Sequence, residues 1–173
     1  MTSSSTRSFA PPSAAEALRE TLRPGDAAQI ERLVRATGVF SPSETAIARE
    51  LVEENLSRGN EVSGYHFLIA DGADGIGGYT CFGPIAGTNA RYELYWIAVD
   101  PAARRSGLGR RLHAATERRV KAMGGAVLIA ETSTTPHYAA ARGFYFAQGY
   151  RLLAEVPDWH DDGDGLAIFG KRL

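Results

Sequence analysis

The first part of the chain has the residue spacing of helices. After the turn at Pro24-Gly25, apolar residues recur every three or four positions over 27–37. This pattern predicts a helix that Asp26 caps and Gly38 ends. A short apolar run over 18–22 predicts a strand before this helix.

A second helix is predicted directly after the first. It is expected to begin at Ser41-Pro42, with the serine as N-cap and the proline in the first turn. Gly59 is expected to end it. The apolar residues expected to face inward are Ile47, Leu51 and Leu56.

From about residue 65 the pattern changes to short apolar runs that are separated by Gly, Asp and Pro turns. Such runs are typical of strands, and two longer periodic segments between them are typical of helices. The predicted strands span 65–70, 76–82, 92–99, 126–132, 150–156 and 166–171, and the predicted helices span 107–123 and 138–148.

The order of these elements is β-α-α-β-β-β-α-β-α-β-β. Strand hairpins fill the first half, and a strand-helix-strand crossover lies in the second half. This order predicts a mixed α/β (α+β) fold with a central, mainly antiparallel sheet flanked by helices. A doubly wound dinucleotide fold is excluded, because its strands and helices alternate throughout.

Composition limits the class of protein. The chain has 173 residues, of which 44% are hydrophobic and 23% are charged, and its net charge is -1. We therefore expect no nucleic-acid partner, and no apolar run reaches the roughly 18–20 residues of a membrane span, so no membrane partner is expected. The chain is expected to form one domain over 13–173, after a Ser/Thr/Pro-rich and mobile segment over 1–12.

Neither the first residues nor the cysteine content point to secretion. Met1 to Ser8 has no apolar run behind it and does not read as a secretory signal, so a cytoplasmic protein is expected. The single cysteine, Cys81, cannot form an internal disulfide and supplies no metal cluster. It is expected to be a packed thiol, and no metal is expected.

The most informative motif lies where the predicted strand over 92–99 ends. Asp100-Pro101 is followed by a loop that runs through Gly107-Leu-Gly109 into a helix start. Free backbone N–H groups and the positive end of a helix dipole bind anions, and the nearby arginines 104, 105 and 110 add full charges. The loop therefore predicts a phosphate or pyrophosphate site. The alternative is a glycine-rich turn with solvated arginines.

Two common nucleotide motifs do not fit this loop. A P-loop needs a Lys-Ser/Thr pair after the glycines, and none is present. A dinucleotide fingerprint needs Gly-x-Gly-x-x-Gly after the first strand and an acid on the next strand, and the chain lacks this arrangement.

The sequence Arg104-Arg-Ser-Gly-Leu-Gly109 resembles the Arg/Gln-x-x-Gly-x-Gly/Ala loop of GNAT acetyltransferases, which also follows an apolar strand. The resemblance extends from about residue 18 to the C-terminus and implies a GNAT-like fold. It implies that acetyl-CoA is the co-substrate, with its pyrophosphate on the loop N–H groups and its pantetheine arm along 97–99. The implied binding residues are Ile97, Ala98, Val99, Arg104, Arg105, Ser106, Gly107, Leu108, Gly109, Arg110, Thr132, Tyr138, Ala141 and Phe144.

The predicted helix over 138–148 carries a candidate general acid. Tyr138, Ala141 and Tyr145 fall on one helix face, which by itself fits core packing as well as a ligand surface. GNAT enzymes end this helix with a similar Ala-Arg-x-Phe-Tyr pattern, and Tyr145 falls on the tyrosine that protonates the departing thiolate. Gly143 departs from the family pattern and costs roughly 1 kcal/mol relative to alanine, so a local irregularity is expected.

The acceptor amine must lose a proton, because an ammonium with a pKa of about 10.4 is not a nucleophile. Glu131 ends the strand before this helix and resembles the base of some GNAT members, acting directly or through water. Glu93, early on the central strand, is the second candidate. The alternative for both is an ion-paired or solvated carboxylate. Backbone N–H groups near Ile97 or Ala98 are expected to stabilise the oxyanion.

The segment over 156–165 is expected to border the acceptor, as the corresponding connection does in the family. Trp159 is expected to stack on the substrate and His160 to lie beside it. The acidic residues around them favour a cationic amine: Asp158, Asp161, Asp162 and Asp164. The alternative is a solvated acidic turn. Phe40, between the first two helices, is the other acceptor-side candidate.

The sequence thus predicts an N-acetyltransferase that moves acetyl from acetyl-CoA to a primary amine by direct attack. The acceptor is a small-molecule amine or a peptide, and a homodimer is possible. Two alternatives stay open: a non-catalytic acyl-CoA-binding sensor that has kept the fold, and a protein acetyltransferase acting on lysine or an N-terminus.

Overall fold

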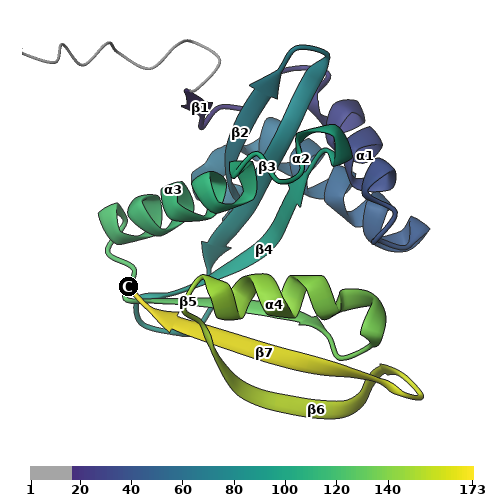
Figure 1. Cartoon of the computed structure of the whole chain (residues 1–173). Helices are drawn as coiled ribbons and strands as arrows, with labels where there is room; N and C mark the ends of the chain where they lie inside the picture. The colour runs from purple at the N-terminus through teal and green to yellow at the C-terminus, as the bar shows by residue number, and fades with distance from the viewer. Residues whose placement is uncertain (1–16) are drawn as a thin grey trace, which may run out of the picture.

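The computed structural model describes residues 17–173, so the segment 1–12, expected to be mobile, lies outside the described residues (Figure 1). The elements are β1 (Leu18–Arg19), α1 (Asp26–Thr37), α2 (Pro42–Ser63), β2 (His66–Gly72), β3 (Gly75–Pro84), β4 (Arg91–Val99), η2 (Pro101–Ala103), α3 (Leu108–Ala122), β5 (Val127–Ser133), η3 (Pro136–Tyr138), α4 (Ala139–Ala147), β6 (Arg151–Asp161) and β7 (Asp164–Arg172). Apart from the short η2 and η3 turns, their order is the predicted one.

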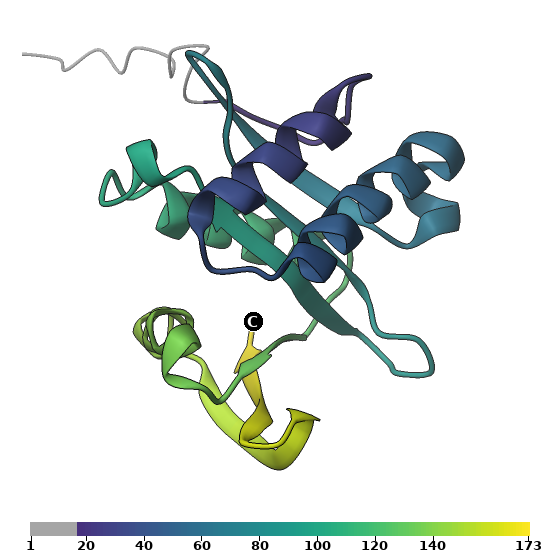
Figure 2. The same ribbon diagram turned by 90° about the vertical axis from the view of Figure 1, so that its right-hand side faces the viewer.

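The strands form one sheet in the order β1-β2-β3-β4-β5-β7-β6. Every neighbouring pair is antiparallel except β4 and β5, which are parallel, so the predicted mixed and mainly antiparallel sheet is confirmed. Helices α1 and α2 cover one face of β2 to β4 and α3 covers the other (Figures 1 and 2). Helix α4 lies along β5 and β7 (Figure 1).

The parallel pair β4–β5 is short, and this sets the position of the site. The two strands pair only from Arg91↔Val127 to Glu93↔Ile129. Beyond this point β4 continues to Val99 paired with β3 alone, and β5 continues to Ser133 paired with β7 alone. The sheet therefore opens between β4 and β5, and the backbone groups on these two inner edges have no partner strand.

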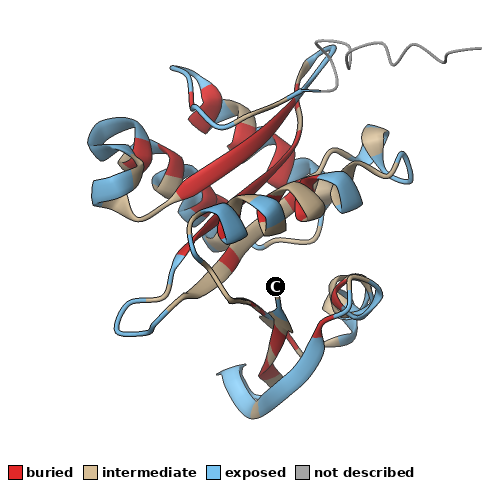
Figure 3. Cartoon of the chain, turned by 90° about the vertical axis from the view of Figure 1, so that its left-hand side faces the viewer, coloured by how far each residue is buried: buried red, intermediate tan, exposed pale blue. Residues whose placement is uncertain are grey.

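Two buried clusters support the two sides of this opening. One lies under α1 and α2 and includes Ile30, Val52 and Phe67. The other lies between α3, α4 and the strands and includes Leu112 and Phe169. Figure 3 shows that the buried positions lie along the centre of the sheet, whereas β6 is exposed along its length.

Helix α2 differs from the prediction in its buried face. Ile47 and Leu56, expected to face inward, are 47% and 41% exposed, so that prediction was wrong, whereas Leu51 packs against the core as expected. The buried residues are Thr45, Ala48, Val52 and Asn55, which follow the same helical period on a neighbouring face. The Asn55 amide is satisfied there because it donates to the Tyr65 carbonyl at 2.7 Å.

Two helix boundaries also differ in detail. Gly59 takes a non-helical conformation (φ 74°) and interrupts α2 as predicted, but a short second helical segment follows across this kink and ends at Gly64. Asp26 starts α1 without capping it. Its buried carboxylate instead accepts hydrogen bonds from the Arg19 guanidinium at 2.8 Å and the Arg23 backbone N–H at 2.7 Å.

We expect Tyr150→Phe to lower the free energy of unfolding by about 1–3 kcal/mol, because it leaves a buried ring nitrogen without its partner. His113 Nε2 and the Tyr150 hydroxyl lie 2.9 Å apart, and the two residues are 1% and 3% exposed. Denaturant unfolding would measure the change. Tyr92→Phe is the matched control, because its hydroxyl donates to the Met123 carbonyl in a half-buried position. A loss no larger than that of the control would contradict the expectation.

In the part of the chain that the structure describes, no helix is both long and apolar enough to span a membrane.

Candidate functional site

A cavity of about 1120 Å³ occupies the opening between β4 and β5. Its walls come from the α1–α2 connection, β4, β5, the start of α3, α4 and the β6–β7 hairpin. Eleven of the residues that the sequence predicted for the site line it: Phe40, Ile97, Val99, Gly109, Glu131, Thr132, Tyr138, Ala141, Phe144, Tyr145 and His160. Segments far apart in the sequence thus meet at the place where strand pairing stops.

The remaining predicted residues lie outside the cavity wall. Two of them, Glu93 and Ala98, are on β4, and Trp159 is on β6. The others belong to the loop before α3 and to its first turn: Arg104 to Leu108 and Arg110. Since Gly109 does line the cavity, the loop adjoins one end of it.

The loop before α3 has the backbone geometry of an anion site. Arg105 (φ 63°) and Gly107 (φ 83°) both adopt left-handed conformations, and Gly107 is the N-cap of α3. Gly109 and Arg110 are in the first turn of this 15-residue helix, where no preceding helical carbonyl accepts their N–H groups. Backbone donors and the positive end of the helix dipole therefore coincide, which fits a phosphate group.

Arg104 is held on the far side of this loop. Its Nη2 donates to the Thr37 carbonyl at the end of α1, at 2.9 Å. The side chain thus ties the loop to the end of α1, next to the α1–α2 connection that lines the cavity. The expectation that Arg104 contacts a phosphate stays a prediction.

Tyr145 combines the two roles that its spacing left open. It is 6% exposed, and its ring packs against Tyr150 and Phe169 with centroids 5.4 and 5.5 Å apart. It also lines the cavity, and within residues 17–173 its hydroxyl forms no hydrogen bond. Burial raises the pKa of Tyr145 to about 12, so the hydroxyl stays protonated at neutral pH.

The expected irregularity at Gly143 is absent. Helix α4 runs from Ala139 to Ala147 without a break. A side-chain Cβ at Gly143 would have no atom within 4 Å, so the glycine faces open space and neither kinks the helix nor admits a close neighbour. The pose of Tyr145 is therefore that of a regular helix.

The two candidate bases occupy different environments at the point where β4 and β5 separate. Glu131 is exposed and lines the cavity, and it forms no ion pair with any residue in 17–173. Glu93, the last residue of β4 that pairs with β5, is half-buried. Burial first, and then the negative charge of Glu131, raise the pKa of Glu93 to about 7. A carboxyl with such a pKa is suited to accept and release a proton near neutral pH.

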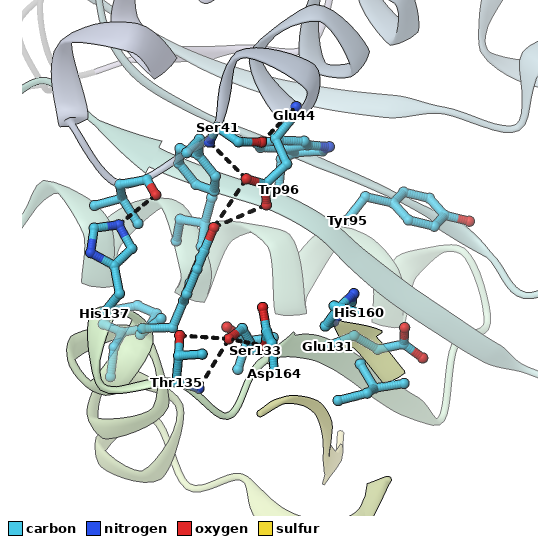
Figure 4. Close-up of a pocket in the computed structure, with 18 of the residues that line it drawn as sticks. Ser41, Glu44, Tyr95, Trp96, Glu131, Ser133, Thr135, His137, His160 and Asp164 are labelled. Carbon is cyan, nitrogen blue, oxygen red and sulfur yellow. Dashed lines mark hydrogen bonds between the residues drawn. The ribbon is translucent and has the colours of Figure 1, made fainter. Parts of the chain in front are cut away.

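The opposite end of the cavity carries a carboxylate that the sequence reasoning did not single out. The Glu44 side chain accepts the Tyr138 hydroxyl at 3.0 and 3.1 Å, which links α2 to η3 across the cavity (Figure 4). Glu44 also closes the capping box of α2, since Ser41 N–H donates to it at 2.8 Å. The Ser41-Pro-Ser-Glu44 pattern was a visible signal for the cap, but it does not reveal that this carboxylate faces a ligand site.

Aromatic side chains separate these two ends. Phe40, predicted on the acceptor side, packs against Trp96 with ring centroids 4.8 Å apart. Trp96 and Tyr95 of β4 also line the cavity. The sequence reasoning missed both, because alternation along a strand does not show which face meets a ligand.

The β6–β7 hairpin brings one predicted residue to the cavity and takes another away. Strand β6 continues to Asp161, well past the predicted end at 156, so most of the expected loop is strand. Successive side chains on a strand point to opposite faces. His160 lines the cavity, whereas Trp159 is 62% exposed and lies outside it.

The acidic turn that joins β6 to β7 contributes two carboxylates. Asp161 and Asp164 line the cavity, and Ser133 Oγ donates to Asp164 at 2.5 Å. Figure 4 shows Glu131 beside His160 at one end, Glu44 at the other, and Asp164 close to Ser133 and Thr135.

Comparisons with known proteins agree with this geometry. A family model for the acetyltransferase (GNAT) domain matches residues 63–152. A crystal structure of a Desulfovibrio desulfuricans protein placed in the GNAT family of acetyltransferases is 41% identical, with a TM-score of 0.87 over 90% of this chain and 98% of that one. None of the curated protein sequences matches this chain.

More distant solved structures share the fold. An aminoglycoside 6'-N-acetyltransferase complexed with coenzyme A is 20% identical, with a TM-score of 0.70 over 90% of this chain and 96% of that one. A ribosomal-protein-alanine N-acetyltransferase from Brucella melitensis is 22% identical, with a TM-score of 0.72 over 91% of this chain and 99% of that one. At these identities the likeness concerns the fold alone.

Proposed function

The chain belongs to the GNAT family of acetyltransferases, and we propose that it transfers acetyl from acetyl-CoA to a primary amine by direct attack in a ternary complex. One observation carries the proposal. The cavity adjoins the N-terminal end of α3 and is also lined by carboxylates, by aromatic side chains and by Tyr145, whose hydroxyl is free within residues 17–173. Structural relatives named as N-acetyltransferases, one of them complexed with coenzyme A, support an amine acceptor and this co-substrate.

The residues present fit acetyl-CoA, which would supply an acetyl group as a thioester. The loop from Arg105 to Arg110 would hold the pyrophosphate through its free N–H groups, such as those of Gly109 and Arg110, with Arg105 and Arg110 adding charge. The inner edge of β4 over 97–99 would bind the pantetheine amides, because it has no partner strand. Ala141 and Phe144 of α4, with Thr132 of β5, would form the opposite wall.

The free edge of β4 also supplies oxyanion donors. In an antiparallel ladder, consecutive residues direct their N–H groups to opposite sides of the strand. Of Ile97 and Ala98, one therefore donates toward β3 and the other toward the cavity side. That second N–H is positioned to stabilise negative charge on the acetyl oxygen as the amine attacks.

Proton removal is assigned to the two glutamates together. Glu131 meets the acceptor because it lines the cavity, and it attracts the ammonium form. Glu93 is outside the cavity wall but close enough to Glu131 for their charges to interact, and its pKa of about 7 suits it to accept the proton through an intervening water. This changes the emphasis of the sequence-based prediction, in which Glu131 was the first candidate for the base.

Tyr145 acts at the leaving group. Its ring packs against Tyr150 and Phe169, and this packing fixes the position of the ring and of its hydroxyl. A phenol is protonated at neutral pH, so Tyr145 can donate a hydrogen bond or its proton to sulfur as the thiolate forms. The homodimer predicted from the sequence stays a prediction.

The co-substrate part of the proposal can be tested by binding alone. Arg110→Gln is expected to weaken CoA binding by about three- to tenfold, because it removes one charge beside the pyrophosphate. Pantetheine, which lacks the phosphates, should bind wild type and variant equally well. Calorimetric titration of both ligands measures this, and an equal loss for both ligands would contradict a phosphate-specific role for the loop.

The activity itself is tested by thiol release from acetyl-CoA over a panel of polyamines, amino acids, aminoglycosides and lysine peptides. Acceptor-dependent release supports the proposed transfer. CoA binding without release on any acceptor would favour the non-catalytic sensor instead, and release with lysine peptides alone would favour a protein acetyltransferase.

A further inference from the structure

The cavity is strongly acidic, and its acidity exceeds what the proposed reaction requires. Four of its lining residues carry carboxylates: Glu44, Glu131, Asp161 and Asp164. No Lys or Arg is among the lining residues, and none of the four forms an ion pair with a residue in 17–173. Elsewhere carboxylates do find partners, as Glu31 does with Arg35 and Arg49.

Three of these four carboxylates form two groups that face the cavity from different elements: Glu131 in one, and Glu44 with Asp164 in the other. Glu131 of β5 is close enough to Glu93 of β4 for their charges to interact. Glu44 of α2 and Asp164 of β7 both act on Tyr138, the first by its hydrogen bonds and the second by its charge. Figure 4 shows Glu44 and Glu131 at separate ends of the cavity.

Aromatic surface connects the two groups. Phe40 and Trp96 pack together at 4.8 Å and both line the cavity. Such faces accept methylene groups and attract cations placed over them. An unpaired hydroxyl on the buried Tyr145 also faces this space, which independently indicates a site that a ligand completes.

The reacting nitrogen cannot balance this charge. An amine attacks only in its neutral form, so at the moment of reaction the nitrogen nearest the thioester contributes no positive charge. The pantetheine arm and the acetyl group are neutral as well. Glu44 and Asp164 are half-buried, so a counter-charge would stabilise them, and a second ammonium group on the acceptor would supply it.

We propose that the acceptor is a small amine with at least two ammonium groups, of which Glu44 and Asp164 hold one while Glu131 faces the nitrogen that is acetylated. This inference rests on the proposed acetyl transfer and specifies its substrate class. Acetylation converts one ammonium into a neutral amide, so the product loses one of its two charge contacts. We therefore expect the monoacetylated product to bind more weakly than the substrate.

The first test compares acceptors that differ only at the far end. Diaminoalkanes with spacers of three to eight carbons are assayed against 1-aminoalkanes and amino carboxylates of the same length. At low ionic strength the best diamine should exceed its matched monoamine by about tenfold to a hundredfold in kcat/KM. The amino carboxylate should be the poorest acceptor, and added salt should reduce the diamine advantage.

The second test removes charge while keeping the local hydrogen bonds. Glutamine can replace Glu44 in a capping box and asparagine can accept the Ser133 hydroxyl, so Glu44→Gln and Asp164→Asn should both fold. Each should lower kcat/KM for the diamine by about three- to tenfold more than it lowers kcat/KM for the monoamine. The matched control is Asp162→Asn, in the same exposed turn but outside the cavity, which should change neither.

Equilibrium binding separates this inference from the activity. The diamine, and not the monoamine, should bind the full chain in calorimetric titration whether or not turnover occurs. If no diamine is bound or used better than its matched monoamine, the two-ammonium acceptor is overturned, even where acetyl transfer to another amine is found. If the diamine binds selectively but no acetyl is transferred, the acetyl-transfer proposal fails while the cation site stands.

Discussion

Replacing Tyr145 by phenylalanine is expected to lower kcat by about a hundredfold or more, with little change in CoA affinity. The substitution keeps the ring that packs against Tyr150 and Phe169, so α4 should stay in place. It removes only the hydroxyl, which has no other partner within residues 17–173 and faces the cavity. The loss should therefore appear in the chemical step, where the sulfur needs a proton.

Steady-state kinetics and CoA titration on the same preparation would separate these effects. Tyr65→Phe is the matched control, because Tyr65 is a half-buried tyrosine that packs on Tyr95 outside the cavity wall. The control should retain its activity within about twofold. If the Tyr145→Phe enzyme has the same kcat as the control, Tyr145 does not act in the chemical step, and the family assignment is unaffected.

The second large effect concerns the base. If Glu93 accepts the proton, Glu93→Gln should lower kcat/KM by about a hundredfold near neutral pH. In the wild type the carboxylate is the active form, and burial and Glu131 raise its pKa to about 7. The rate should therefore rise with pH through about 7 as Glu93 loses its proton, and it should fall as pH drops below that value.

Glu131→Gln distinguishes the two glutamates. The negative charge of Glu131 is one cause of the raised pKa of Glu93, so its removal should lower that pKa and move the acid limb of the pH profile to lower pH. The shift should be partial, because burial is the larger cause. Abolished activity in Glu131→Gln, together with an active Glu93→Gln enzyme, would make Glu131 the base.

The element order and the backbone geometry of the loop before α3 could be predicted from the sequence because both depend on local patterns. Alternating and helical spacing define strands and helices, and the Gly107-Leu-Gly109 turn carries its own backbone geometry. The mixed sheet followed from that order, and the single parallel pair β4–β5 follows from the crossover through α3.

Features that depend on tertiary contacts could not be predicted in the same way. The buried face of α2 follows Thr45, Ala48 and Val52, because the sheet beneath determines which stripe of the helix is covered. The apolar residues Ile47 and Leu56 predicted the wrong face, because an apolar side chain does not by itself show which side of the helix the sheet covers.

The cavity wall shows the same limit at the level of single side chains. Trp159 and His160 are adjacent in sequence, but the length of β6 decides which of them faces the cavity. Glu44 is far from both in sequence and reaches the cavity only because Tyr138 meets it across the opening of the sheet. The raised pKa of Glu93 likewise arises from burial between β4 and β5.

The most direct test of acetyl transfer to an amine is to follow acetyl-CoA, isotopically labelled in the acetyl carbonyl, by nuclear magnetic resonance with a primary amine and the full chain present. We expect the thioester signal to be replaced by an amide signal on the amine, at a rate that depends on amine concentration. Conversion of the label to free acetate alone, or an unchanged thioester with every amine, would contradict it.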